Sequence, residues 1–414
     1  MSSTITVAYL LSTFPQLTQT FVTREIFWIR SHDVRVEIFS LFKPESIPAE
    51  AQARELMSRV HYSPPLSANV VAALIHFLVR SPLRLLRALG RTIVHGYREP
   101  KLLLQALSIF PKSVYFARQM KKLEIEHIHA HFVTLAAFAA GTAAELLGVT
   151  FTVHGHAVDL FSRDARDVRR QLENASGVVT ISSFHRAFIS GLCPAVDQEN
   201  LQVVYCGLET DRFQPASGQT DSGGPLRILS IGRLIEKKGF EYLIDACKIL
   251  ADAGYSFQCQ IVGDGPLQDA LQERIDRHGL QERVHLLGAL QQDRVLALYG
   301  QSDMFALACV VADDGNRDGL PVVLIEAMSC ELPVVTTPVT GIVDLVEHNR
   351  TGILVKERDA AALADTLKLL IERRDLRESM GRLGRQKILS DFQVQQTTAR
   401  LASFFRKVAG RRGA

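Results

Sequence analysis

Short apolar runs alternate along this chain with longer segments in which apolar residues recur every three or four positions. Runs of the first kind predict buried parallel strands, and segments of the second kind predict helices. The predicted strands cover residues 4–11, 34–41, 126–132, 149–153, 178–182, 201–206, 227–231, 257–262, 284–287, 304–311, 333–337 and 352–355. The predicted helices cover residues 21–31, 135–147, 240–253, 266–277, 293–299 and 321–328, and the tail from residue 359 is helical. Strands that alternate with helices in this way predict an α/β fold with doubly wound parallel sheets.

Two domains are expected, because the chain is too long for a single hydrophobic core. It has 414 residues, whereas single cores stop growing at about 250–300 residues. Residues 214–225 are rich in Gly, Ser and Pro and predict a linker. We therefore predict a Rossmann-like domain over residues 1–213, a second over 226–390, and a C-terminal helix over 391–414 that packs back on the first. The cleft between the domains is the expected ligand site.

The composition is that of an ordinary globular protein. Apolar residues make up 47% and charged residues 22%, and the net charge is +3, so the whole chain is not a polyelectrolyte binder. The six cysteines are scattered without a C-x-x-C pair, which fits a reducing compartment. The first residues lack the features of a signal peptide, and no apolar run approaches the roughly 20 residues that span a bilayer. We expect a cytoplasmic protein.

Residues 66–122 depart from this balanced charge, because they contain many Lys and Arg residues but a single acidic residue, Glu99. Arg80, Arg84, Arg87 and Arg91 keep a spacing that places them on one helical face. A basic amphipathic helix predicts peripheral contact with an anionic membrane, here on the inner face of the plasma membrane. The alternative is a solvated helix face over the core. No aromatic-basic module is recognisable, so nucleic acid is not an expected partner.

The first strand–helix turn, at residues 12–20, carries hydroxyls and amides but no glycine. A dinucleotide fingerprint would place G-x-G-x-x-G there. No other strand–helix turn carries that motif, so a dehydrogenase is disfavoured. A different polar ligand fits this turn, with Thr18 and Gln19 as its candidate contacts.

Histidines gather near the ends of two predicted strands. His127, His129 and His131 would share one face of the strand 126–132, and the strand 149–153 leads to His154. Zinc is an alternative, but no Cys, Asp or Glu lies at ligand spacing, and three histidines on one strand face are not a known zinc spacing. We therefore predict no metal. His154 is the site candidate, because open α/β sheets bind ligands at the carboxyl ends of their strands.

Residues 313–330 follow the strand 304–311 with a polar loop and then an apolar helix. Backbone N–H groups at the start of such a helix favour an anion. Glu326 is the only charge between residues 321 and 329, and a carboxylate there needs a hydrogen-bonding partner. Asp318 and Glu326 therefore predict a site for a ligand with phosphate and hydroxyl groups. The alternative is a helix-capping aspartate and a structurally paired glutamate.

Two further loops carry candidate chemistry. Residues 232–239, with the sequence GRLIEKKG, form the first strand–helix junction of the second domain. Arg233 and Lys238 beside a helix N-terminus would neutralise a diphosphate, and the alternative is a charged surface loop. Gly263 and Gly265 close the next strand and allow close approach of the backbone.

Together these motifs resemble the retaining GT-B glycosyltransferases of family 4, over nearly the whole chain. The matching segments are HAHF at 129–132, TVHGHAVDL at 152–160, VVYCGLETDRF at 203–213, GRLIEKKG at 232–239, VGDGP at 262–266 and the acid–seven–acid motif of Asp318 and Glu326. The segment FPQLTQTF at 14–21 is most similar to the bacterial exopolysaccharide and colanic-acid type. The resemblance implies a GT-B architecture in which the first domain binds the acceptor and the second binds a nucleotide sugar.

The resemblance also implies roles for the matching residues. Arg233 and Lys238 would hold the donor diphosphate and steady the leaving group, and Glu326 would bind the ribose hydroxyls. Asp318 would contact the donor sugar, and His154 would lie at the reacting face near sugar and acceptor. The implied catalytic set is thus His154, Arg233, Lys238 and Asp318. The donor-binding set adds Gly232, Gly263, Gly265, Gly319, Leu320, Val322 and Glu326, and the acceptor-binding set is Thr18, Gln19 and His154.

Two positions depart from the family pattern. The first acid of the motif is usually glutamate, and Asp318 is one methylene shorter, so Asp313 or Asp314 is an alternative contact for the sugar. Pro321 lacks an N–H, so Val322 and Val323 would have to supply the helix-start donors to phosphate.

The implied activity is transfer of a hexose, with retention, from a UDP- or GDP-linked donor to a lipid-linked oligosaccharide or polysaccharide precursor of a cell-surface glycan. The family is usually metal-independent, because Arg and Lys charge in the phosphate pocket replaces a metal, so no cofactor is expected. One alternative is a nucleotide-sugar epimerase of the same fold, which needs no acceptor. The other is a noncatalytic nucleotide-sugar-binding protein.

Overall fold

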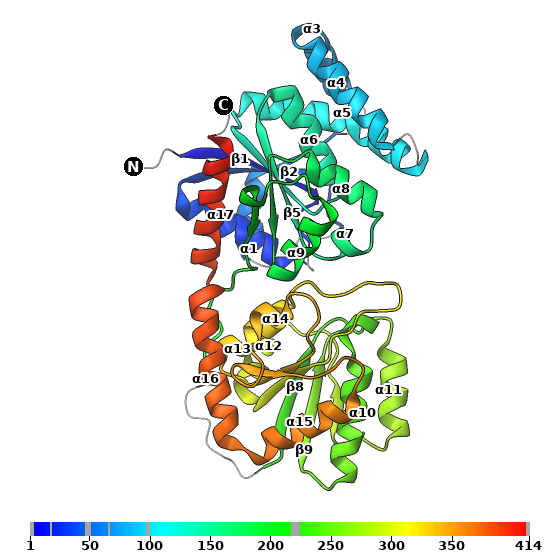
Figure 1. Cartoon of the computed structure of the whole chain (residues 1–414), viewed down its shortest axis with the longest axis vertical. Coiled ribbons are helices and arrows are strands. Elements are labelled where there is room, and N and C mark those ends of the chain that lie inside the picture. Colours follow the sequence, from blue (N-terminus) through cyan, green and yellow to red (C-terminus); the bar gives the residue numbers. More distant parts are fainter. Residues whose placement is uncertain are drawn as a thin grey trace. The chain divides into compact units, whose positions relative to one another are not determined.

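The chain forms two compact units, here described from a computed structural model of residues 4–16, 19–45, 51–64, 67–96, 100–216 and 224–410 (Figure 1). The first unit contains residues 1–181, 185–207 and 394–414, and the second contains residues 182–184 and 208–393. The division after residue 207 comes before the predicted boundary at residue 213. Residues 217–223 of the predicted linker lie outside the described part of the chain.

The first unit is built on a seven-stranded sheet with the order β3-β2-β1-β4-β5-β6-β7. Every pair of neighbouring strands is parallel. The strands are β1 (Ile5–Thr13), β2 (Val34–Phe42), β3 (Val60–Tyr62), β4 (His127–His131), β5 (Thr150–Gly155), β6 (Gly177–Thr180) and β7 (Leu201–Val203). The sequence prediction missed β3, because three half-buried residues leave no apolar run to recognise.

Helices cover this sheet, and one of them comes from the far end of the chain. They are α1 (Thr20–Ile29), α2 (Ala51–Leu56), α3 (Ala68–Arg80), α4 (Pro82–Gly96), α5 (Pro100–Lys122), α6 (Leu135–Leu147), α7 (Val158–Phe161), α8 (Ala165–Glu173), α9 (Ser183–Leu192) and α17 (Val394–Ala409). In α17, Leu401, Phe404 and Phe405 share a buried core with residues of β1 and α1. The C-terminal helix therefore belongs to the first unit (Figure 1).

The second unit repeats this design with a six-stranded parallel sheet in the order β10-β9-β8-β11-β12-β13. Its strands are β8 (Leu226–Ile231), β9 (Phe257–Val262), β10 (Val284–Leu286), β11 (Met304–Leu307), β12 (Val334–Thr336) and β13 (Gly352–Leu354). Its helices are α10 (Phe240–Asp252), α11 (Gln268–Arg277), α12 (Gln292–Gln301), α13 (Val322–Ser329), α14 (Ile342–Leu345), α15 (Ala360–Glu372) and α16 (Arg374–Asp391). The predicted fold class of two doubly wound parallel sheets is confirmed.

Both sheets change direction beside their first strand. β1 lies between β2 and β4, and β8 lies between β9 and β11. In open α/β sheets, ligands bind outside the carboxyl ends of the strands at such a switch point. The strand order thus selects, in each unit, the edge of the sheet where a site is expected.

The strand predicted for residues 304–311 ends early, at Leu307. The N–H of Val310 donates to the carbonyl of Lys237 at 3.0 Å, and the N–H of Val311 donates to the carboxylate of Glu357 at 2.8 Å. The backbone groups after β11 therefore pair with neighbouring loops instead of with another strand. The buried apolar run continues beyond the strand and supports the loop that follows.

The basic helical face predicted for Arg80 to Arg91 is interrupted. α3 ends at Arg80, Pro82 begins α4, and the two helices are bent by 117°. Proline excludes the residue before it from the helical region, and Ser81 has φ −151° and ψ 56°. Arg80 therefore does not share a helical face with Arg84, Arg87 and Arg91, and that prediction was wrong.

Among the described residues, no single helix has both the length and the apolar composition needed to cross a membrane. α3 and α4 meet those criteria only when the bent pair is taken together.

Candidate functional site

Three loops of the second unit meet at the switch point of its sheet. Residues 232–239 follow β8, residues 263–267 follow β9, and residues 308–321 connect β11 with α13. The predicted donor-binding residues all lie on these loops or on the first two turns of α13. The fold therefore brings together motifs that are separated by up to about 80 positions in the sequence.

Asp318 lies between two lysines and joins the loop after β11 to the loop after β8. Its carboxylate is 2.6 Å from Nζ of Lys238 and 3.2 Å from Nζ of Lys237. All three side chains are largely buried, with 13–14% of their surface exposed. The thiol of Cys309 also donates to Asp318, at 3.6 Å. This cluster of Asp318, Lys237 and Lys238 is called the lysine–aspartate cluster below.

The lysine–aspartate cluster stays charged although it is buried. Burial alone would raise the pKa of Asp318, but Lys238 and Lys237 hold it below its ordinary value. Burial alone would lower the pKa of Lys238, yet the neighbouring Asp318 raises it. With two lysines for one carboxylate, the cluster carries net positive charge and suits an anion. Asp318 is thus an ion-pair partner and not a helix cap, since the N-cap of α13 is Pro321.

Arg233 lies in the same loop as the two lysines but does not take part in their ion pairs with Asp318. Its side chain is exposed, and its guanidinium has no hydrogen-bond or ion-pair partner within the described ranges. An exposed, unpaired guanidinium can reorient towards a bidentate anion without breaking an existing contact.

The two alternative carboxylates, Asp313 and Asp314, do not contact the two lysines. Asp313 pairs with Arg358 at 3.0 Å and is 87% exposed. Asp314 accepts a hydrogen bond from the N–H of Asn316 at 2.8 Å. Asp313 therefore joins the loop to Arg358, Asp314 stabilises a turn within the loop, and Asp318 is the carboxylate that lies beside the two lysines.

Glu326 lies on the second turn of α13 and has a protein partner. The hydroxyl of Tyr299 donates to Glu326 at 2.9 Å, and Tyr299 is completely buried. Burial and the charge of Glu326 raise the pKa of Tyr299 well above its ordinary value, so the hydroxyl keeps its proton. The structurally paired glutamate that the sequence allowed is therefore present, and the same pairing holds the carboxylate in position.

The loop that leads into α13 is also held by hydrogen bonds from Thr340 and Gly341. The carbonyl of Gly319 accepts hydrogen bonds of 2.9 Å from the hydroxyl of Thr340 and from the N–H of Gly341. Leu320 is buried, and α13 begins at Val322. The helix start that was predicted to face an anion is thus in place, with Pro321 outside the first turn.

Gly263 and Gly265 serve contacts between loops. Their φ angles are 143° and 152°, in a region that only glycine adopts readily. A Cβ on Gly263 would collide with the carbonyl oxygen of Gly232, and one on Gly265 would meet the backbone of Leu234 at 2.6 Å. These glycines let the loops after β8 and β9 pack against each other. The need for glycine at both positions is therefore explained by packing within the protein.

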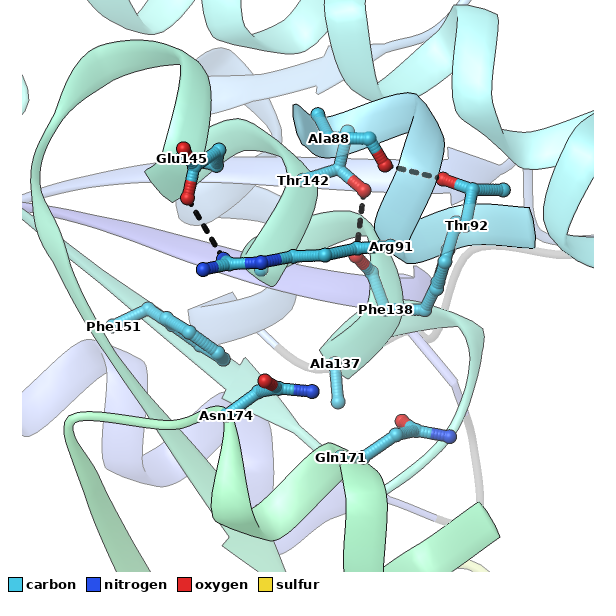
Figure 2. A pocket seen from close by; sticks show the side chains of 11 residues that line it. Ala88, Arg91, Thr92, Ala137, Phe138, Thr142, Glu145, Phe151, Gln171 and Asn174 are labelled. Carbon is cyan, nitrogen blue, oxygen red and sulfur yellow. Dashed lines mark hydrogen bonds and ion pairs between the residues drawn. The ribbon is translucent and has the colours of Figure 1, made fainter. Parts of the chain in front are cut away.

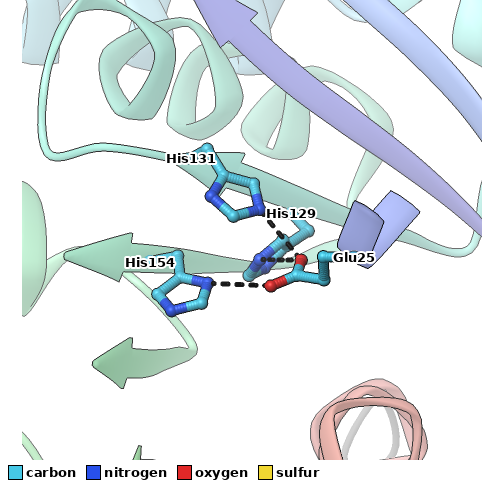
Figure 3. Close-up of side chains that lie close together, drawn as sticks. All are labelled: Glu25, His129, His131 and His154. Atoms are coloured by element: carbon cyan, nitrogen blue, oxygen red, sulfur yellow. Dashed lines mark hydrogen bonds and ion pairs between the residues drawn. The ribbon is translucent and has the colours of Figure 1, made fainter. Parts of the chain in front are cut away.

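In the first unit, three histidines and one glutamate converge (Figure 3). Glu25 lies on α1, His129 and His131 on β4, and His154 on β5. One oxygen of Glu25 is 2.9 Å from Nε2 of His131 and 3.9 Å from Nε2 of His129, and its other oxygen is 3.6 Å from Nδ1 of His154. Burial lowers the pKa of His129 and of His154 well below 6.5, and neighbouring histidines lower them further.

His154 is thus at the carboxyl end of a strand, as predicted, but only 2% of it is exposed. Its predicted contact with a sugar or acceptor stays a prediction. Gln19 precedes α1 and is half-buried, and Thr18 lies outside the described residues. Glu25 was missed by the sequence analysis. A charged residue within the largely apolar segment 20–29 is the signal that could have identified it.

Two arginines of α4, Arg84 and Arg91, contact α6; Figure 2 shows the contact of Arg91 with Glu145. Nη1 of Arg91 is 2.8 Å from the carboxylate of Glu145 on α6, beside a pocket of about 50 Å³ between α4, α6 and α8. Nη1 of Arg84 donates to the carbonyl of Leu146 at 3.4 Å. Two of the four arginines predicted to face a membrane are therefore engaged by α6.

The helices α3, α4 and α5 expose an unusual amount of apolar surface. The exposed apolar side chains on these helices, together called the α3–α5 apolar set, are Val71, Ile75, Leu78, Val79, Leu83, Leu86, Ile93, Val94, Leu104 and Leu107. Arg80, Arg87 and Lys101 are exposed on the same helices, which project from one end of the first unit (Figure 1). A soluble surface seldom gathers so many apolar side chains without a binding role.

Comparisons with known proteins match both halves of the chain. Residues 19–212 match the family model described as Glycosyltransferase Family 4, and residues 213–387 match the model described as Glycosyl transferases group 1. The amylovoran biosynthesis glycosyltransferase AmsK of Erwinia amylovora is 31% identical over 372 residues, which cover 86% of this chain and 88% of AmsK. The putative colanic acid biosynthesis glycosyltransferase WcaL of Salmonella typhimurium is 32% identical over 260 residues, covering 61% of this chain and 63% of WcaL.

A solved structure shows the same fold. The Anabaena protein HepE, in complex with UDP and glucose, aligns with a TM-score of 0.70 and 17% identity, covering 97% of this chain and 100% of HepE. The family resemblance drawn from the motifs and the predicted GT-B architecture are both confirmed.

The contact between the two glycine loops can be tested by adding a methyl group. We expect Gly263→Ala to destabilise the protein by about 3 kcal/mol or more, because the strained backbone and the collision with Gly232 act together. Gly279→Ala is the matched control, since Gly279 has φ 66° and open space around its Cβ position, and should cost only about 1–2 kcal/mol. Urea unfolding measures both, and equal losses would contradict the collision.

Proposed function

Because this chain belongs to the family 4 glycosyltransferases, and is a hexosyltransferase related to enzymes of exopolysaccharide biosynthesis, we propose that it transfers a hexose, with retention, from a nucleotide diphosphate sugar to a lipid-linked glycan precursor. The observation that carries the donor half of this proposal is the lysine–aspartate cluster at the switch point of the second sheet. The α3–α5 apolar set supports the lipid half.

The diphosphate of the donor binds Arg233 and Lys238. Lys238 already holds one carboxylate at 2.6 Å, so an anionic ligand oxygen can take over or share this contact without exposing an unpaired charge. Arg233 supplies a second cation, and the first turn of α13 supplies N–H donors from Val322 and Val323. Because Arg and Lys provide the positive charge, the donor side of the reaction requires no divalent metal.

The other groups recognise the rest of the donor. Glu326, held by Tyr299, accepts hydrogen bonds from the ribose hydroxyls. Asp318 and the backbone amides of Gly319 and Leu320 contact the hexose. The presence of UDP and glucose in the HepE structure supports a UDP-hexose, and a GDP-linked donor is the alternative that binding measurements separate.

The transfer needs no protein nucleophile. The bond between the anomeric carbon and the phosphate oxygen breaks, the acceptor oxygen bonds to the same face of that carbon, and the acceptor proton passes to the departing phosphate. Arg233 and Lys238 act in this step by stabilising the charge that develops on the leaving diphosphate. Retention then follows from attack on the face that the leaving group vacates.

The α3–α5 apolar set brings the enzyme to the lipid-linked acceptor. Apolar side chains gain free energy when they enter the acyl boundary of a bilayer, and each Lys or Arg close to an anionic surface adds about 1 kcal/mol. Arg80, Arg87 and Lys101 provide such charges beside the apolar set. We place this contact on the cytoplasmic leaflet of the plasma membrane, where anionic lipid is abundant.

Donor binding is testable by thermal shift with a panel of UDP- and GDP-sugars. A donor raises the melting temperature of the wild type by mass action, and Arg233→Ala should weaken its binding about 10- to 100-fold, as expected for one charge-assisted contact. Because the Arg233 side chain has no partner, the ligand-free melting temperature should not change. Lys248→Ala, on the exposed face of α10 and paired with Asp252, is the control that keeps full donor binding.

An Arg233→Ala protein that still shifts like the wild type would remove the phosphate assignment. The same donors separate the alternative activities. Release of the nucleoside diphosphate should require a lipid-linked acceptor. A rearranged nucleotide sugar formed without an acceptor would identify an epimerase instead, and binding without any turnover would identify a noncatalytic protein.

Membrane contact is testable by co-sedimentation with vesicles. We expect the wild type to sediment with anionic vesicles, and less so at high salt, because screening weakens the attraction of exposed charges. Leu83→Glu combined with Leu86→Glu should abolish sedimentation by placing charges on the apolar set. Ile249→Glu changes an equally apolar exposed residue on α10 and should have no effect. Equal recovery with neutral and anionic vesicles would contradict the electrostatic part of the proposal.

A further inference from the structure

The convergence of Glu25, His129, His131 and His154 is not used by the donor chemistry, which lies in the second unit. One ligand-type atom from each residue lies within 4.8 Å of the corresponding atoms of the other three. The four residues come from α1, β4 and β5. Figure 3 shows the three imidazole rings gathered around the carboxylate of Glu25, to which dashed lines join them.

The outer nitrogens of two of these histidines are already paired. Nδ1 of His129 lies 2.7 Å from the hydroxyl of Thr152, and Nδ1 of His131 lies 3.1 Å from Nε2 of His156. These contacts orient the rings so that Nε2 of each faces the centre. Such outer partners are characteristic of metal-binding histidines, because they fix the ring and its tautomer.

The inner nitrogens are incompletely satisfied. Nε2 of His129 and Nδ1 of His154 face the carboxylate of Glu25 and are buried without a hydrogen-bond partner. Native proteins rarely leave buried polar atoms unpaired, and each such atom calls for an unseen water, ion or function. Two unpaired nitrogens that face the same carboxylate point to a missing cation.

The carboxylate completes the set. Glu25 supplies a negative charge among three imidazoles, and the hydroxyl of Tyr9 donates to it at 3.1 Å, which holds it in place. The separations of 2.9, 3.6 and 3.9 Å between its oxygens and the imidazole nitrogens are close to the roughly 3.3–3.5 Å that separates two ligands at bond lengths of about 2.0–2.2 Å around a tetrahedral ion.

We propose that Glu25, His129, His131 and His154 bind a Zn²⁺ ion. Three imidazole nitrogens and one carboxylate oxygen are ligands that Zn²⁺ accepts in tetrahedral geometry. Four protein ligands leave no open position, so the site is structural and ties α1 to β4 and β5. A small cavity lies beside the cluster and is lined by Glu25, His154 and residues of α17 such as Thr397.

The proposal also bears on His154. As a zinc ligand it would bind the ion through Nδ1. The proposal concerns the first unit alone and does not depend on the donor assignment, so either can fail without the other.

The test uses the full-length protein, purified without a histidine tag and without chelators. Elemental analysis should find one equivalent of zinc per chain. Removal of the metal with a chelator should lower the melting temperature, and added Zn²⁺ should restore it, because a ligand that binds only the folded state stabilises it. Co²⁺ added to the metal-free protein should produce the intense visible absorption of a tetrahedral site.

Three variants identify the ligands. Glu25→Gln, His129→Gln and His154→Ala should each lose the zinc and the Co²⁺ spectrum. His127→Gln is the matched control, because His127 lies on the same face of β4 and is equally buried, but bonds to Thr150 and Thr152 instead of Glu25. This control should keep both signals.

A wild-type protein that contains no zinc, gains no stability from Zn²⁺ and shows no Co²⁺ spectrum would overturn the proposal. So would unchanged metal content in Glu25→Gln and His129→Gln, which would place the metal elsewhere. His154→Ala protein that keeps its zinc but loses transfer activity would assign His154 to the sugar instead. The wild-type measurements remain decisive even if a variant does not fold.

Discussion

The lysine–aspartate cluster is the interaction on which the second unit's site depends. It joins two loops whose residues are about 80 positions apart, and the mutual attraction of Asp318 and Lys238 keeps both charged in a largely buried place. Removing one partner of a buried ion pair costs about 3–5 kcal/mol, since it leaves the other charge uncompensated. The cluster therefore holds the loops in place before any ligand arrives, and its excess positive charge is available to an anion.

The first unit also buries a cluster of polar side chains, but this cluster has an excess of electron-pair donors instead of cations. On β4 and β5, His129 and His154 direct buried ring nitrogens without hydrogen-bond partners towards the carboxylate of Glu25. The second unit has surplus cations, and its proposed ligand is a phosphate group, whereas the first has surplus donors of electron pairs, and its proposed ligand is a metal ion. Both consequences follow from burying polar groups at a switch point, where the ends of neighbouring strands bring side chains together.

The helices α3, α4 and α5 show how a local break changes a surface. Without the interruption at Ser81, Arg80 to Arg91 would form one basic stripe. With it, Arg84 and Arg91 turn to α6, and the surface that remains combines a few cations with ten exposed apolar side chains. Such a surface suits insertion into the boundary of a bilayer better than purely electrostatic contact, which agrees with an enzyme whose proposed acceptor is attached to a lipid.

The sequence alone determined the features that depend on neighbouring residues. The alternation of apolar runs and helical periodicity predicted two parallel sheets, and the segments around Arg233, Asp318 and Glu326 identified the family, because these signals are contained within short windows. Pro82 was also readable as a break, although the regular arginine spacing concealed it. Tertiary structure decided what depends on strand order. It brought Lys237 and Lys238 to Asp318, ended β11 at Leu307, and placed Glu25 beside histidines more than 100 residues away. No periodicity encodes these partnerships, because the order β2-β1-β4-β5, and not distance along the chain, sets which side chains meet.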